Sequence, residues 1–267
     1  MMLDVKDLRV SFLREKLPPA EVIHGVSFSL ERGETLGIVG ESGSGKTAMS
    51  LAIIGLLAST ATATGEVMFE GRDLLKMPEP DLCKLRGNRI GMIFQEPMTA
   101  LNPAMRVGAQ ISEGLILHKG LSKSEGRKEA LRLLEMVQIP RAGQMIDSFP
   151  HEMSGGQRQR VGIAIALALK PDLLIADEPT TALDVTVQAE VLDILDDLVT
   201  DLGISLILIS HDLGVIARIA DRTLVMFRGD EMEEGPTERV LRNPSHEYTR
   251  KLLDAMPARV RASLKEA

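Results

Sequence analysis

The sequence predicts an α/β fold with a mostly parallel sheet that a helical segment interrupts. Short apolar runs typical of buried strands, such as TLGIVG and SLILIS, alternate with longer amphipathic runs, which is the pattern of βαβ units. From about Pro97 to Pro150 the periodicity is helical instead, as in KEALRLLEMV, and contains no convincing strand. We therefore expect one sheet whose strands come from both sides of a helical insertion.

The expected elements follow in order along the chain. Before the insertion, strands are predicted in LDVKDLRVSF, VIHGVSFSL, TLGIVG, EVMFEG and RIGMIFQ, and a helix is predicted from Lys46 through MSLAIIGLL. After it come a helix (QRQRVGIAIALAL), a strand (DLLIAD), a helix (TVQAEVLDILDDLVTDL), a strand (SLILIS), a helix (LGVIARIA) and a strand (TLVMFRG). The last 25 residues should form a helical, charged tail.

The amino-acid composition indicates which classes of protein the chain can belong to. Hydrophobic residues make up 44% and charged residues 26% of 267, and the formal net charge of −7 argues against a nucleic-acid binder. The single cysteine, Cys83, excludes an internal disulfide and fits a reducing compartment. The start of the chain lacks the apolar core of a signal peptide. The uncharged run from Thr47 to Gly65 turns polar in ASTATATG, so we expect a buried helix and a loop rather than a membrane span.

A phosphate-binding loop is predicted in GESGSGKT, which fits the pattern G-x4-G-K-[ST] between an apolar strand and a helix. Glycines allow backbone amides to surround a phosphate, lysine adds a cation for the β- and γ-phosphates, and threonine offers a hydroxyl to Mg²⁺. The alternative is a chance glycine-rich turn, which the flanking strand and helix disfavour. The loop comprises Gly40, Glu41, Ser42, Gly43, Ser44, Gly45, Lys46 and Thr47.

Two carboxylates follow the apolar strand LLIA. Asp177 suits coordination of Mg²⁺, and Glu178 is placed to polarise a water for attack on the γ-phosphate as general base. The alternative is that the acidic pair caps the next turn. Gln95, at the end of GMIFQ, could touch Mg²⁺ or the attacking water. His211 follows LILIS at the carboxyl end of a strand, where open α/β sheets bind ligands, although a lone histidine is more often structural.

A second glycine-containing loop occurs in HEMSGGQRQR. Ser154, Gly155 and Gly156 open a predicted helix, which is an arrangement that binds phosphate, but this loop has no lysine. The other interpretation is that Ser154 merely caps the helix.

Taken together and in this order, GESGSGKT, Gln95 in FQEP, MSGGQ, LLIADEP with TALD, and His211 in SHD resemble the nucleotide-binding domain of ABC (ATP-binding cassette) proteins. The resemblance spans about residues 3 to 255. It implies a P-loop NTPase fold with a RecA-like core, an N-terminal antiparallel β subdomain and an inserted α-helical subdomain. We expect one domain over 1–255, with core and β subdomain in 1–96 and 151–235, the helical subdomain in 97–150, and a helical tail over 236–267.

The resemblance also implies how the second loop works. In this family two such domains pair head to tail, and each ATP lies between one subunit's phosphate loop and the other's signature loop. Ser154, Gly155, Gly156 and Gln157 would then contact ATP held by the partner, and Asp184 would lie at the dimer seam. Thr47, Gln95 and Asp177 would hold Mg²⁺. Phe12 is the candidate to stack on adenine, although the family often has tyrosine there. Met153 replaces the usual leucine of the signature.

Narrower motifs, including EPMTALNP and NPSHEYT, look like the dipeptide, oligopeptide and nickel importer group. The implied protein is an ATPase on the cytoplasmic face of the inner membrane. Its partners would be a second ATPase subunit, two permeases that dock a short helix into the cleft between the loop of Gln95 and the helical insertion, and indirectly a periplasmic or extracellular solute-binding protein. With Cys83 alone, no iron–sulfur cluster is expected. A nickel importer, a soluble complex such as carbon–phosphorus lyase, and a DNA-repair or translation ATPase remain alternatives.

Overall fold

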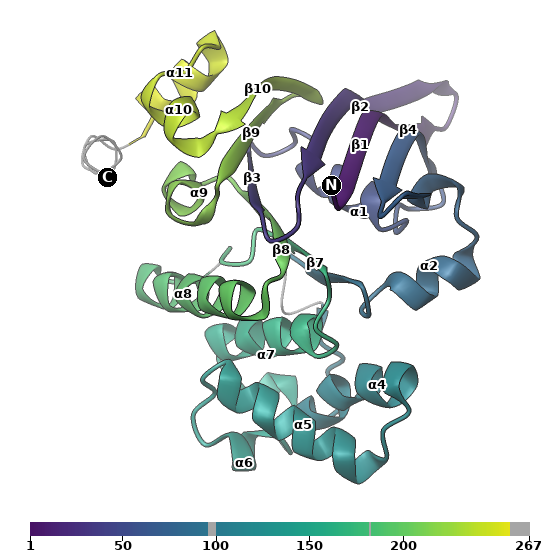
Figure 1. Cartoon of the computed structure of the whole chain (residues 1–267), viewed down its shortest axis with the longest axis vertical. Coiled ribbons are helices and arrows are strands. Elements are labelled where there is room, and N and C mark those ends of the chain that lie inside the picture. The colour runs from purple at the N-terminus through teal and green to yellow at the C-terminus, as the bar shows by residue number, and fades with distance from the viewer. Residues whose placement is uncertain (96–99, 182, 257–267) are drawn as a thin grey trace. The chain divides into compact units, whose positions relative to one another are not determined.

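The structure, a computed structural model, describes residues 1–95, 100–181 and 183–256. These residues form two packed units (Figure 1). The first unit comprises Met1–Leu82 together with the chain from Ser205 onward, and the second comprises Cys83–Ile204. The division falls within helix α2 (Glu79–Leu85) and just before strand β8 (Ser205–Ser210).

An antiparallel sheet forms the N-terminal part of the first unit. Its strands β1 (Leu3–Arg14), β2 (Leu17–Leu30), β4 (Ala61–Phe69) and β5 (Arg72–Asp73) lie in the order β2-β1-β4-β5. The pairing of β1 shifts between Val5 and Leu8 with β2 and between Lys6 and Arg9 with β4, around Asp7, which has a φ of 45°. This irregularity keeps both Val5 and Leu8 buried although they are three positions apart. The predicted antiparallel β subdomain therefore exists.

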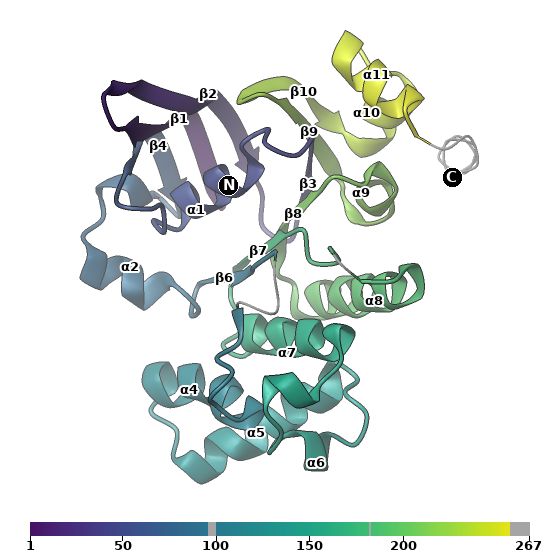
Figure 2. The same cartoon turned by 180° about the vertical axis from the view of Figure 1, so that it is seen from behind.

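A parallel set of strands forms the rest of the first unit. Strands β3 (Thr35–Val39), β8 and β9 (Arg222–Phe227) are parallel, and β10 (Asp230–Pro236) pairs antiparallel with β9. Every residue of β3 and β8 is buried, as expected of strands covered on both faces. Helix α1 packs against β1 and β2 (Figure 2). The helices are α1 (Lys46–Ile53), α9 (Leu213–Ile219), α10 (Thr237–Arg242) and α11 (Glu247–Asp254), with a 3-10 turn at Leu74–Lys76.

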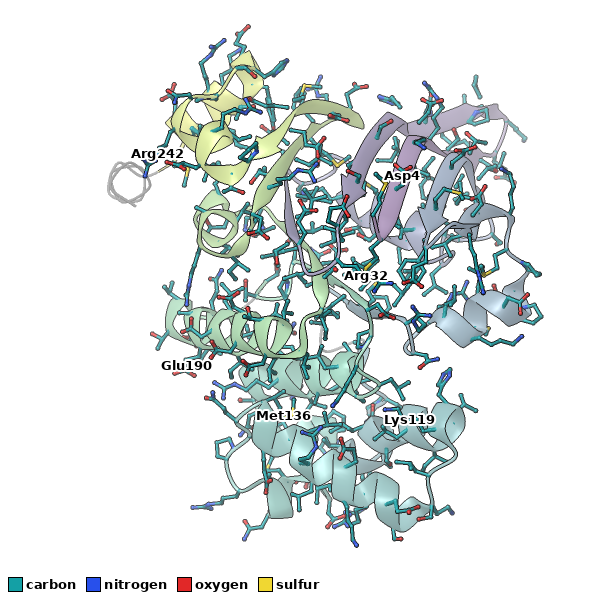
Figure 3. All side chains as sticks on the ribbon, viewed as in Figure 1. Asp4, Arg32, Lys119, Met136, Glu190 and Arg242 are labelled. Carbon is teal, nitrogen blue, oxygen red and sulfur yellow. The ribbon has the colours of Figure 1, made fainter. Side chains whose placement is uncertain are left out.

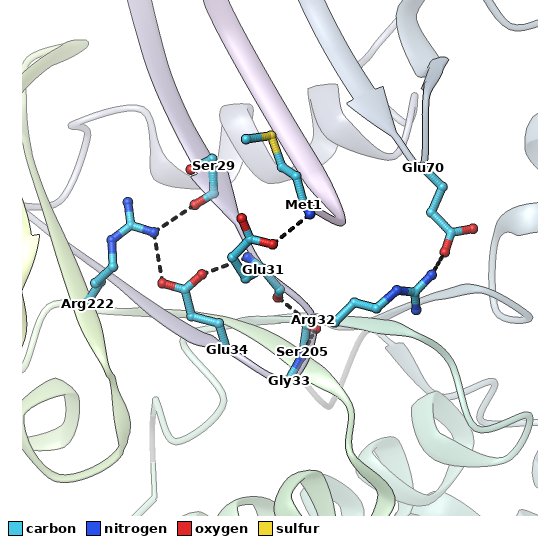
Figure 4. Close-up of polar contacts among 9 residues, drawn as sticks. All are labelled: Met1, Ser29, Glu31, Arg32, Gly33, Glu34, Glu70, Ser205 and Arg222. Atoms are coloured by element: carbon cyan, nitrogen blue, oxygen red, sulfur yellow. Dashed lines mark hydrogen bonds and ion pairs between the residues drawn. The ribbon is translucent and has the colours of Figure 1, made fainter.

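The turn from β2 into β3 joins the antiparallel sheet to the parallel strands through polar contacts (Figure 4). Glu34 pairs with Arg222 of β9 at 2.8 Å and accepts a hydrogen bond from the Glu31 amide at 2.7 Å. Ser205 of β8 accepts from the Gly33 amide at 2.7 Å and donates to the Glu31 carbonyl at 3.1 Å. These contacts connect the turn to β8 and β9, the two strands that pair with β3.

The second unit combines two parallel strands with helices. Strands β6 (Ile90–Ile93) and β7 (Leu173–Asp177) pair in parallel. Helix α7 packs against α4, α5 and α8, and Glu190 of α8, labelled in Figure 3, pairs with Arg160 of α7 at 2.6 Å. The helices are α4 (Val107–Lys119), α5 (Lys123–Met136), α6 (Ala142–Met145), α7 (Gly155–Leu167) and α8 (Val185–Leu202), with a 3-10 turn at Pro150–Glu152.

The structure differs from several sequence expectations. ASTATATG is not all loop, because Ala61–Thr64 pair with β1 and start β4. Helix α1 ends at Ile53, before Gly55 with its φ of 66°, and β6 ends at Ile93, short of Gln95. Strand β10 was not predicted, because DEMEEGP lacks apolar alternation. Among the residues described, no helix has both the length and the apolarity to cross a membrane.

The expected domain limits remain predictions. Residues 96–99, at the start of the expected helical subdomain, and residues 257–267 of the expected tail lie outside the described part of the chain.

Candidate functional site

The predicted phosphate loop connects β3 to α1. Gly43 and Gly45 have φ values of 79° and 97°, which side chains other than glycine rarely adopt. A Cβ on Gly40 would lie 2.2 Å from the Met226 carbonyl oxygen, and one on Gly45 would lie 2.8 Å from the Val22 carbonyl oxygen. The glycines are therefore required both by the turn and by the closeness of the neighbouring strands.

The lysine of this loop is held by the loop's own carbonyls. Lys46 is 5% exposed, and its Nζ donates to the Gly40 carbonyl at 2.7 Å and to the Glu41 carbonyl at 3.0 Å. Ser44 is buried beside it, whereas Glu41, Ser42, Gly43 and Thr47 are exposed. A buried ammonium needs strong acceptors, and phosphate oxygens would be better ones than carbonyls. The loop thus combines a cation, a helix N-terminus and accessible backbone, which fits a phosphate group.

Two further predicted residues belong to the same unit. His211 is exposed and directly follows β8. Its neighbours fix the backbone, because Asp212 donates through its amide to Ser210 Oγ at 2.9 Å and its carboxylate caps α9 at the Gly214 amide at 2.7 Å. Phe12 lies half-buried in β1, opposite Ala20 and Ala61. Its stacking on adenine remains a prediction.

In the second unit, the two predicted carboxylates stand at the end of β7. Asp177 is the last residue of the strand and is 1% exposed, so its carboxylate lies in a site with little solvent. Glu178 has a φ of 47°, a strained conformation for a residue with a side chain and one that is concentrated at functional sites.

The structure brings Gln95 and Glu178 together. The Gln95 amide donates to Glu178 Oε2 at 3.2 Å, although the two residues are 83 positions apart. Thr181 donates its hydroxyl to the same oxygen at 2.8 Å. Both hydrogen bonds are accepted by the same carboxylate oxygen, Oε2. This arrangement orients a carboxylate in the way that a general base needs. Sequence reasoning missed Thr181, for which a hydroxyl three residues after the glutamate would have been the signal.

The second glycine loop caps helix α7. Ser154 is the N-cap residue: its Oγ accepts from the Gln157 amide at 3.3 Å, and its own amide donates to Gln157 Oε1 at 2.9 Å. Ser154 and Gly155 are exposed, and a Cβ on Gly156 would lie 2.5 Å from Cγ1 of Val187. Ser154 therefore caps the helix, which is compatible with phosphate binding because the helix N-terminus stays exposed.

Asp184 caps the next helix, α8, because its Oδ1 accepts from the Val187 amide at 3.0 Å. Its side chain is exposed beside Val185, which is 82% exposed.

A profile of the ABC transporter family matches residues 23–181, which is more than half of the chain. The chain belongs to the ABC transporter family. A second profile, that of the oligopeptide/dipeptide transporter C-terminal region, matches residues 232–265. The chain is therefore an ATP-binding protein with ATPase activity.

Curated ABC relatives cover nearly all of the chain. The oligopeptide transport ATP-binding protein OppD of Salmonella typhimurium (strain LT2) is 50% identical over 259 residues, which cover 96% of this chain and 76% of that protein. OppD of Escherichia coli (strain K12) is 51% identical over 258 residues, with the same coverage. The dipeptide transport ATP-binding protein DppD of Lactococcus lactis subsp. cremoris is 49% identical over 258 residues, 96% of this chain and 74% of that protein.

Solved ABC cassettes share the fold. The dimeric post-hydrolysis state of the cassette MJ0796 bound to ADP and Pi superimposes with a TM-score of 0.79 at 29% identity, covering 88% of this chain and 99% of that one. CbiO1 of Clostridium perfringens, part of the ABC transporter complex cbiONQ, gives 0.75 at 27% identity, covering 99% and 98%. These similarities confirm the predicted P-loop NTPase fold.

Proposed function

We propose that this ABC ATPase energises the uptake of dipeptides or oligopeptides through partner permeases. The observation that carries the proposal is the match of residues 232–265 to the oligopeptide/dipeptide transporter C-terminal region. The ABC core is common to transporters of many solutes, whereas this C-terminal segment points to the oligopeptide and dipeptide transporters among them. Identity of about 50% to OppD and DppD proteins supports the same assignment.

In the proposed mechanism, the phosphate loop binds the triphosphate of ATP and Glu178 activates water. Lys46, now bonded to the Gly40 and Glu41 carbonyls, would transfer its hydrogen bonds to phosphate oxygens. Glu178 would accept the proton of the attacking water, with Gln95 and Thr181 holding its carboxylate. His211, exposed after β8, would contact the γ-phosphate.

We propose that Mg²⁺ is the metal, because each of the three residues assigned to it from the sequence carries an oxygen ligand, which this cation prefers. These residues are Thr47, Gln95 and Asp177, whose carboxylate is buried. When bound, the cation would neutralise charge that develops on the transferred phosphoryl group.

Dimerisation is the next part of the proposal, because the second glycine-containing loop has no cation of its own. Ser154, Gly155, Gly156 and Gln157 offer an exposed helix N-terminus without a cation, so we propose that they contact ATP held by a second subunit's phosphate loop. Asp184, exposed at the start of α8, would lie at the same seam. ATP would then favour the closed dimer, and hydrolysis would release it.

A groove in the second unit suits a permease. It has a volume of about 630 Å³ and lies between α4, α5 and the segment before the 3-10 turn at Pro150. The exposed area of its lining is mainly apolar, and Leu117 on α4 is 76% exposed. The charged residues of the lining are Arg106, Glu113, Lys123, Arg127 and Asp147. We propose that a short cytoplasmic helix of one permease docks here and that the second permease docks in the same way on the partner ATPase subunit, which would place the subunit on the cytoplasmic face of the inner membrane.

To test the proposal, the tagged subunit is isolated from membranes, and the complex of proteins that co-purify with it is reconstituted. Recovery of two multi-span membrane proteins, and ATP hydrolysis stimulated by a solute-binding protein loaded with peptide, is the expected result. Stimulation by nickel-loaded but not peptide-loaded binding protein would support the nickel alternative. Recovery in a purely soluble complex would contradict the transport function.

A further inference from the structure

The proposed general base is the first residue of a tight turn that follows β7. The Thr181 amide donates to the Glu178 carbonyl at 3.1 Å, which closes a four-residue turn over residues 178–181. Pro179, the second residue of the turn, is buried, and its ring fixes its own φ. Thr181, the last residue, also donates its hydroxyl to Glu178 Oε2 at 2.8 Å. The orientation of the Glu178 carboxylate therefore depends on the shape of this turn.

Thr180 is the third residue of the turn, and its dihedral angles are not restrained by a ring. It is 7% exposed, and its hydroxyl oxygen accepts a hydrogen bond from the side-chain amide of Gln188 at 3.0 Å. Its carbonyl accepts a hydrogen bond from the Leu183 amide at 3.3 Å. The side-chain bond to Gln188 thus connects this buried corner of the turn to a residue eight positions along the chain.

Gln188 lies near the start of α8, which is firmly packed in the second unit. Its backbone amide donates to the Asp184 carbonyl at 2.8 Å, as part of the helix, and its side chain is half-buried. Two positions further along, Glu190 pairs with Arg160 of α7 at 2.6 Å. The donor that reaches Thr180 is therefore carried by a helix, which holds a side chain more precisely than a loop does.

We infer that Gln188 is a positioning residue for ATP hydrolysis, whose bond to Thr180 holds the turn that orients the Glu178 carboxylate. Glu178 has a φ of 47°, and a strained conformation of this kind persists only where neighbouring contacts maintain it. Of the two donors to Glu178 Oε2, Thr181 belongs to the turn and Gln95 does not. Loss of the Gln188 bond should therefore weaken the orientation of the base without abolishing it. The inference rests on the proposed function in that Glu178 is the base.

The effect should fall on kcat rather than on nucleotide affinity. Neither Gln188 nor Thr180 belongs to the phosphate loop, whose lysine is held by the Gly40 and Glu41 carbonyls. Proton transfer to Glu178, in contrast, requires that its carboxylate be correctly oriented. If Gln188 only stabilised the fold, its loss would lower turnover equally whether or not residue 178 can accept a proton.

The test measures kcat and the KM for ATP in the complex that co-purifies with the subunit from membranes. Gln188→Met keeps the length of the side chain but removes the donor, and it should lower kcat roughly two- to tenfold, the range of one hydrogen bond, with KM within about twofold. Thr180→Val should act in the same way, whereas Thr180→Ser, which keeps the hydroxyl, should retain most of the wild-type kcat. The double variant Gln188→Met with Thr180→Val should be no slower than the slower single variant. Gln144→Met, the same substitution at an exposed position of α6, is the matched control and should change nothing.

A second comparison separates positioning of the base from a general structural role. In a Glu178→Gln background, where the base is absent, adding Gln188→Met should change the residual single-turnover rate by less than about twofold. An unchanged kcat in Gln188→Met, an equal loss in Thr180→Ser and Thr180→Val, or an undiminished loss in the Glu178→Gln background would overturn the inference and leave the proposed function standing. Wild-type turnover in Glu178→Gln alone would instead remove the proposed base, and the inference with it.

Discussion

Replacement of Glu233 by glutamine should destabilise the first unit measurably. Burial alone would raise the pKa of Glu233, but hydrogen bonds from Ser245 and His246 outweigh it and lower the pKa from 4.5 to about 2. Each pKa unit corresponds to roughly 1.4 kcal/mol, so ionised Glu233 contributes about 3 kcal/mol to the free energy of unfolding at neutral pH. The side chain is 2% exposed, so solvent screens these bonds little. Because an amide keeps one acceptor oxygen, Glu233→Gln should cost about 2–3 kcal/mol.

The pH dependence has a defined sign. Since the pKa in the folded state is lowered, the stabilisation is fully present above about pH 4.5 and is lost as the pH falls towards 2. The stability difference between wild type and Glu233→Gln should therefore shrink on acidification, and it isolates Glu233 because both proteins share every other group.

The assay is urea unfolding at several pH values, followed by the emission of Tyr248, which is the sole tyrosine. Glu238→Gln is the control. Its carboxylate is 75% exposed and pairs with Arg242 at 3.1 Å, so its loss should cost less than about 0.5 kcal/mol. A Glu233→Gln protein within about 0.5 kcal/mol of wild type at pH 7, or a difference that persists on acidification, would refute the reasoning.

The remaining predictions concern catalysis and assembly. Glu178→Gln should retain ATP binding and trap a closed dimer while lowering turnover about 10²- to 10⁴-fold; wild-type turnover would exclude Glu178 as the base. Ser154→Trp should spare nucleotide binding to the isolated subunit but abolish ATP-dependent dimerisation seen by cross-linking, whereas Ser122→Trp, which removes the same kind of cap from α5, should leave dimerisation intact. Loss of dimerisation in both variants would show that Ser154 acts only as a helix cap. Specific ATPase activity should fall on dilution, and concentration-independent turnover would contradict a site completed by a second subunit.

Local patterns in the sequence were sufficient for most of the strands and helices and for the phosphate loop, although not for β10. Fully apolar runs such as SLILIS became buried strands, and the glycines of GESGSGKT occupy the positive φ angles and close approaches that the pattern predicts. Ser154 and Asp184 start their helices as N-cap residues, because capping depends only on neighbours three positions along the chain. These features depend on residues that are close together in the sequence, so they can be predicted from the sequence alone.

The contacts between distant segments were decided by tertiary structure. The bond from Gln95 to Glu178 joins two strand ends that are 83 positions apart, and the strained φ of Glu178 has no counterpart in residue type. Strand β10 exists because β9 offers an open edge, although its own sequence lacks a strand pattern. The ring contact of Tyr248 with Phe227 joins α11 to β9, and Glu233 of β10 accepts hydrogen bonds from Ser245 just before α11. The sequence by itself determined which chemical groups this ATPase carries, whereas tertiary packing decided which of these groups are in contact. Contacts between distant segments produce no periodic pattern in the sequence, so they cannot be predicted from it.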